Sequence, residues 1–141
     1  MFKKILVPVD IQRPGQAAEI LKVAGQLASQ FDSAVHVMTV MPGYGMPLVA
    51  TYFPADAKNT AKHEIEARLG SLIDANYPAK ATYGVAEGKR AEEILKAAKR
   101  RKSDLILIGF KSTGKLSDTI LGSVGTKVAQ RANCSVMVLR I

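Results

Sequence analysis

Five short apolar runs alternate with segments of helical spacing along this 141-residue chain, and this alternation limits the fold more than any other feature. Strands are expected at 2–9, 34–41, 80–85, 105–108 and 134–139, and helices at 17–31, 55–77, 88–101 and 124–132. Strands joined by helical crossovers pair in parallel in one sheet. The sequence therefore predicts a single α/β domain over residues 1–141, with an open five-stranded parallel sheet and helices on both faces.

The stretch from Ser103 to Thr126 carries the clearest sign of a ligand site. Its apolar run at 105–108 is expected to be a strand buried on both faces, and it breaks at Gly109 into a polar loop. The loop closes at Gly122, where the next helix begins. A strand, a glycine loop and a helix start together place backbone N–H groups and a helix dipole in front of an anion, usually phosphate.

One pattern that fits this stretch is the P-loop, G-x-x-x-x-G-K-[ST]. Gly109, Gly114 and Lys115 match it, but Leu116 stands where a hydroxyl must hold Mg²⁺. A P-loop phosphotransferase is therefore a minor alternative, and it predicts Mg²⁺-dependent turnover that requires Lys115.

A second pattern, G-x2-G-x9-G-[ST], is the signature of the universal stress protein family. Gly109, Ser112, Gly122 and Ser123 lie at its spacing, with Ser112 in place of the second glycine. The chain resembles this family along nearly its whole length, from KKILVPVD near the start to CSVMVLRI at the end. The resemblance implies a Rossmann-like fold similar to that of the adenine-nucleotide α-hydrolases. It also implies a stress-response protein that binds ATP or AMP, with or without Mg²⁺.

Carried onto this sequence, the resemblance implies roles for a few residues. Asp10, which ends the first strand, would contact the nucleoside, and the backbone of Val40 would read the adenine ring. Gly109, Gly122 and Ser123 would surround the phosphates. The predicted site also includes the residues beside these positions: Pro8, Val9, Ile108, Lys111, Ser112 and Val124.

Ser112 is the one departure from the family signature. If a glycine is needed there for positive φ or for close approach, the serine narrows the phosphate pocket. If it is not needed, the hydroxyl is an additional phosphate donor. The alternative function is a dimeric interaction module of the stress response that binds no nucleotide.

No arrangement of residues predicts an efficient enzyme. We find no nucleophile–base pair and no metal triad, so we expect at most slow ATP hydrolysis, with the nucleotide acting as a switch on conformation or partner choice. His36 is expected to pack within its strand, because no carboxylate or nucleophile is spaced to partner it. Cys134 is the single cysteine, which excludes an internal disulfide.

Charge and length bear on partners and location. The formal net charge is +8, but the basic residues are spread along the chain apart from the run at 99–102. That run falls at a predicted helix end, where cations are favoured, so we prefer a solvated helix end to a nucleic-acid surface. No apolar run reaches membrane length and no apolar leader opens the sequence, so we expect a cytoplasmic protein.

The last strand is expected to mediate dimerisation. It runs from Cys134 to Leu139, is apolar, and is predicted to lie at a sheet edge, where unpaired backbone groups invite another chain. Family members pair this strand across a two-fold axis. The resemblance therefore implies a homodimer through 134–139, together with a protein partner that the sequence does not identify.

Overall fold

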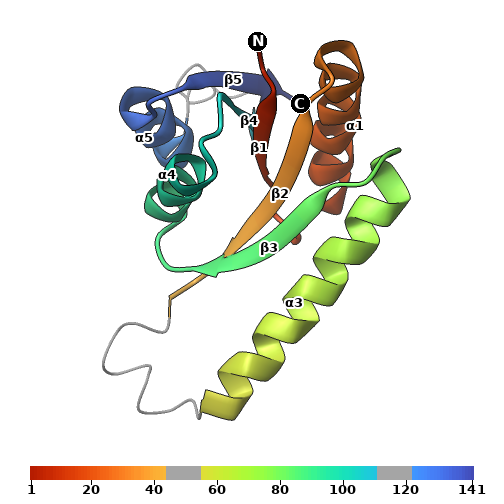
Figure 1. Ribbon diagram of the computed structural model, residues 1–141. Coiled ribbons are helices and arrows are strands. Elements are labelled where there is room, and N and C mark those ends of the chain that lie inside the picture. The colour runs from red at the N-terminus through yellow and green to blue at the C-terminus, as the bar shows by residue number, and fades with distance from the viewer. Residues whose placement is uncertain (44–54, 111–121) are drawn as a thin grey trace.

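The computed structural model describes residues 1–43, 55–110 and 122–141, and within them one parallel sheet is covered on both faces by helices (Figure 1). The elements are β1 (Lys4–Pro8), α1 (Pro14–Phe31), β2 (Ala34–Met41), α3 (Ala55–Asn76), β3 (Thr82–Glu87), α4 (Arg90–Arg101), β4 (Leu105–Phe110), α5 (Ser123–Arg131) and β5 (Ser135–Arg140). The predicted fold class is confirmed.

The strand order is β3-β2-β1-β4-β5, so the chain reverses its direction across the sheet between β1 and β4. These two strands are parallel neighbours, with Ile5 opposite Leu105 and Leu6 opposite Ile106. In an open parallel sheet such a switch point leaves a crevice at the carboxyl ends of the two strands.

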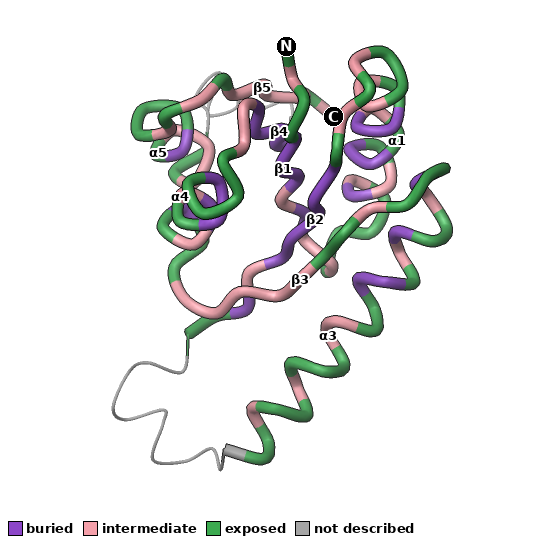
Figure 2. Tube along the Cα trace, viewed as in Figure 1, coloured by how far each residue is buried: buried purple, intermediate pink, exposed green. Residues whose placement is uncertain are grey.

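Alternate residues of the strands enter two separate cores. On one face Ile5, Val7 and Leu107 pack with α1 and α3, and on the other face Leu6 and Ile106 pack with α4 and α5. Burial on both faces explains the nearly continuous apolar runs of the central strands. Figure 2 shows the buried residues concentrated along the central strands and along the helix sides that face them.

Four of the five strands differ from the predicted ranges, and β5, at Ser135–Arg140, differs by only one residue at each end. β1 is shorter than predicted, at Lys4–Pro8, and β3 lies two residues later than expected, at Thr82–Glu87. The break predicted at Gly109 is wrong, because β4 continues through Gly109 to Phe110, paired with Leu139 and Arg140 of β5. The predicted loop with Ser112 and Lys115 lies outside the described residues, as does the segment 44–54.

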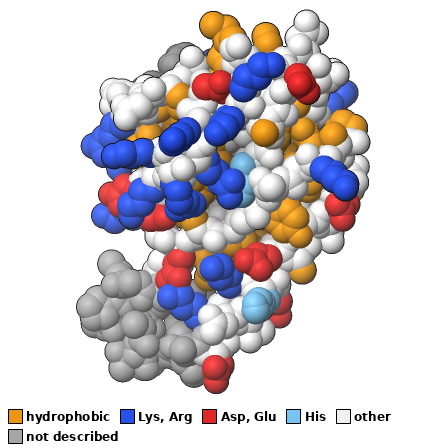
Figure 3. Space-filling model, in the orientation of Figure 1, with side chains coloured by type: hydrophobic (Ala, Val, Ile, Leu, Met, Phe, Trp, Pro, Cys, Tyr) orange, Lys and Arg blue, Asp and Glu red, His pale blue; other side chains and the backbone are white. Residues whose placement is uncertain are grey.

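The helices begin and end where local chemistry favours it. Pro14 opens α1 with its φ already suited to a helix, and Asp32 closes it in the left-handed conformation. The first turn of α4 carries two glutamates and its last turn carries Lys99, Arg100 and Arg101, as the helix dipole favours. Figure 3 shows that basic side chains gather over α4 and α5. None of the described helices could serve as a membrane span.

Candidate functional site

A cavity of about 320 Å³ opens at the carboxyl ends of β1 and β4, at the switch point of the sheet. Eight of the predicted site residues line it: Pro8, Val9, Asp10, Val40, Ile108, Gly109, Gly122 and Val124. They come from four separate parts of the chain, the ends of three strands and the start of α5. Ser123 lies between two lining residues, whereas Lys111 and Ser112 lie outside the described part of the chain.

The cavity also has lining residues that the sequence patterns did not indicate: Arg13, Gln16, Ile20, Thr39, Arg90, Ile94, Phe110 and Gly125. Arg90 could have been found, because it follows the third strand at the same sheet edge as Asp10. Arg13 lies only three residues beyond Asp10, and its backbone N–H donates to the Asp10 carbonyl at 3.0 Å.

Asp10 is held in one orientation by its neighbours. Its Oδ1 accepts a hydrogen bond of 2.9 Å from the backbone N–H of Gln12. Its Oδ2 lies 3.6 Å from a guanidinium nitrogen of Arg90 and 3.9 Å from Nε of Arg13. The Asp10 side chain is 24% exposed, so an incoming ligand can still reach it.

Gly109 and Gly122 lack a side chain for different reasons. A Cβ on Gly109 would lie 2.5 Å from Cδ1 and 3.0 Å from Cγ1 of Ile20, so this glycine is needed for the packing of α1 on β4. A Cβ on Gly122 would meet no described atom within 4 Å. Gly109 therefore serves a packing function that the loop pattern did not predict, whereas at Gly122 no described atom excludes a side chain.

The start of α5 presents backbone donors to the cavity. The helix begins at Ser123 after Gly122, its first turn carries no acidic residue, and no described side chain caps it. The first four N–H groups of a helix have no partner within the helix. Together with the positive end of the dipole, they form a site suited to an anion such as phosphate.

The sequence profile of the Universal stress protein family matches residues 1–140. The chain belongs to this family. Universal stress protein YxiE of Bacillus subtilis is 30% identical over 152 residues, covering 99% of this chain and 100% of that protein. Universal stress protein MJ0531 of Methanocaldococcus jannaschii is 28% identical, covering 99% of this chain and 83% of that protein.

Solved structures share the fold of this universal stress protein. The hypothetical protein MJ0577 superposes with a TM-score of 0.77 at 24% identity, covering 100% of this chain and 97% of its own. A universal stress protein in complex with cAMP gives a TM-score of 0.68 at 21% identity, with coverage of 97% and 95%. One from Archaeoglobus fulgidus in complex with dAMP gives 0.66 at 21% identity, with coverage of 98% of both chains.

Two reactive side chains outside the cavity, His36 and Cys134, are buried and half-buried within the fold. His36 is buried in β2, its Nδ1 lies 2.8 Å from Oγ1 of Thr82, and it does not line the cavity. Burial, followed by the charges of Arg101 and Arg100, lowers the pKa of His36 to about 4. Burial also raises the pKa of the half-buried Cys134 thiol, which disfavours the reactive thiolate.

Proposed function

We propose that this universal stress protein binds an adenine nucleotide in the cavity at the ends of β1 and β4. The observation that carries the proposal is the convergence of eight residues, chosen from the sequence, around one cavity at the switch point of the sheet. Family members with the same fold have been solved with cAMP and with dAMP, and both of these ligands contain adenine.

In this proposal each part of the cavity has a separate task. The apolar side near Val9 and Val40 holds the base, and Asp10 accepts a hydrogen bond from the nucleoside. The phosphates lie at the start of α5, where the hydroxyl of Ser123 adds to the backbone donors. ATP and AMP both suit this arrangement, since they share the base, the ribose and the first phosphate.

The described residues do not fit a dedicated magnesium site. Mg²⁺ prefers oxygen ligands, and Asp10 supplies the only carboxylate among the described lining residues. That carboxylate already faces two guanidinium groups. We therefore propose that the nucleotide acts as a switch on conformation or partner binding in a stress response.

We further propose a cytoplasmic homodimer formed through β5. This strand, Ser135–Arg140, is at the edge of the sheet, as predicted, and beyond it no described strand pairs. Its four central residues are only partly buried, which leaves area for a second copy. Sedimentation equilibrium should give twice the 15.1 kDa mass of one chain, whereas a single-chain mass at micromolar concentration would refute the dimer.

The first experiment is to purify the protein without added ligand, denature it and identify any released nucleotide by chromatography. Near-stoichiometric AMP or ATP is the expected result. The thermal shift with millimolar AMP or ATP should fall in Asp10→Asn but persist in Asp32→Asn, a matched change at the C-cap of α1. An empty wild-type protein that also shows no thermal shift would instead support the interaction module that binds no nucleotide.

A further inference from the structure

A second cavity continues from the proposed nucleotide cavity beyond Asp10. It has a volume of about 400 Å³. The two cavities share five lining residues: Asp10, Arg13, Thr39, Val40 and Arg90. The second one extends to the end of β2 at Met41 and to Ile65 of α3. A ligand in the first cavity therefore has adjoining room on the side of Asp10 that faces away from the start of α5.

The shared wall carries an excess of positive charge. Asp10, Arg13 and Arg90 are the charged residues among the described lining of both cavities, so two guanidinium groups face one carboxylate. The separations of 3.6 and 3.9 Å are loose, and the two arginine side chains are 57% and 60% exposed. Each guanidinium has five N–H donors in a planar fork, so both retain donors for a further anion.

The carboxylate has less capacity left than the arginines. One oxygen of Asp10 already accepts from the backbone of Gln12, and the other faces both guanidinium groups. A lone carboxylate at this position would repel a phosphate. The two arginines reverse the sign of the local charge and make the wall suited to an anionic group. Thr39, which is only 5% exposed, lines the same wall.

We propose that the second cavity binds a phosphate carried on the 2′- or 3′-hydroxyl of the ribose, so that the preferred ligand is an adenine nucleotide with phosphates at both ends of its sugar. This inference rests on the proposed function, because that function orients the nucleotide with its 5′-phosphate at α5 and its nucleoside at Asp10. The ribose hydroxyls then face Arg13 and Arg90. Dinucleotide sites use the same chemistry, in which a carboxylate binds a free ribose hydroxyl and a nearby arginine accommodates a ribose phosphate.

Calorimetry with the full chain tests the proposal. The ligands are AMP, adenosine 2′,5′-bisphosphate and adenosine 3′,5′-bisphosphate, at one fixed ionic strength because salt screens exposed charges. We expect one bisphosphate to bind about tenfold to a hundredfold tighter than AMP, as charge-assisted hydrogen bonds to a new phosphate allow. The comparison of the two bisphosphates assigns the hydroxyl that carries the phosphate.

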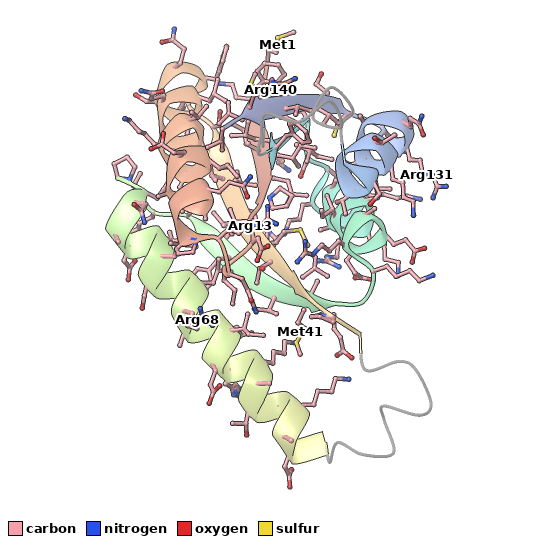
Figure 4. The ribbon with its side chains drawn as sticks, turned by 180° about the vertical axis from the view of Figure 1, so that it is seen from behind. Met1, Arg13, Met41, Arg68, Arg131 and Arg140 are labelled. Carbon is pink, nitrogen blue, oxygen red and sulfur yellow. The ribbon has the colours of Figure 1, made fainter. Side chains whose placement is uncertain are left out.

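Three variants identify the residues responsible. The AMP dissociation constant divided by the bisphosphate dissociation constant should fall to a value between about 1 and 3 in Arg90→Gln. This ratio should also decrease in Arg13→Gln, as expected when a charged partner is removed. Arg131→Gln makes the same charge change at the last residue of α5 and should keep the wild-type ratio; Figure 4 shows Arg131 on α5, away from Arg13. The melting temperature of each variant checks that the fold is retained.

The outcomes separate this inference from the proposed function. If AMP and the bisphosphates bind the wild type equally, the inference is overturned while nucleotide binding stands, and the arginines only neutralise Asp10. A wild-type preference that survives in both arginine variants overturns the assignment to this wall. If no ligand binds the wild type, the proposed function fails and the inference fails with it.

Discussion

Replacing Gly109 by alanine tests whether this glycine serves the packing of the core. The added Cβ would lie 2.5 Å from Cδ1 of Ile20, 3.0 Å from its Cγ1 and 3.3 Å from Cδ1 of Ile141. Ile20 is 3% exposed and packed among α1 and the strands, and because it also lines the cavity, relief of the contact requires its side chain to leave its packed position and turn into the cavity. Overpacking by one methyl group in such a core lowers the free energy of unfolding by about 1–3 kcal/mol.

Urea unfolding followed by far-UV circular dichroism, without added nucleotide, measures this loss. In a domain of this size it corresponds to a fall in melting temperature of about 3–9 °C. Gly122→Ala is the matched control, because its Cβ would meet no described atom within 4 Å and its φ is −56°. Alanine lowers the entropy of the unfolded chain, which stabilises the fold, but it is a poorer helix cap than glycine, which destabilises the fold. The free energy of unfolding should therefore change by no more than about 0.5 kcal/mol.

A double-mutant cycle assigns the loss to Ile20. Ile20→Val removes the Cδ1 atom that would lie closest to the new methyl group, and by itself it costs about 0.5–1.5 kcal/mol. Combined with Gly109→Ala, it should cost less than the sum of the two single changes by at least about 0.5 kcal/mol. Additive losses, or a Gly109→Ala protein as stable as the wild type, would refute the packing explanation.

Three further predictions concern other parts of the fold. Asp104→Ala should lower the free energy of unfolding by about 1–3 kcal/mol in urea, because its carboxylate accepts backbone N–H groups of Lys3 and Lys4 at 2.7 and 2.9 Å, and Asp104→Asn should lose less. Gly88→Ala should cost about 1–3 kcal/mol in thermal unfolding, since Gly88 has a φ of +141°, whereas an unchanged melting temperature would contradict the strain. The pKa of His36 lies near 4, below its ordinary 6.5, so the unfolded state binds more protons than the folded state between these pH values. The free energy of unfolding should therefore fall as the pH drops from 6.5 toward 4. An NMR titration midpoint near 6.5 for His36 in the folded protein would exclude this.

The sequence predicted the elements well where burial leaves a periodic pattern. The range predicted for β2 matches the structure, and the helix predicted at 55–77 ends one residue earlier, at Asn76. The third strand was placed two residues early because β3 lies at the sheet edge, where Thr82 and Tyr83 are exposed and the apolar pattern is weak. The fourth strand was ended too early, because a glycine followed by polar residues is also the pattern of a loop.

The candidate site was predicted in part. Asp10 and Gly122 could be selected because strand ends and helix starts of a parallel sheet meet at one edge, whereas Val40 was implied by the family resemblance alone. Arg90 follows the third strand at the same sheet edge, but its contact with Asp10 could not be predicted, because it joins residues eighty positions apart and depends on how α4 packs against the sheet. The contact of Ile20 with Gly109 was missed for the same reason, because no local pattern encodes which side chain of α1 faces β4.

The sequence by itself determined the order of strands and helices, the parallel sheet and the edge at which a ligand site can form. Hydrophobic periodicity and turn chemistry are local, so they can be read along the chain. Only the tertiary structure decided that Asp10 faces two arginines and that a second cavity continues beyond it. Both features depend on the distances between side chains from different elements, and these distances are set by the packing of the helices on the sheet.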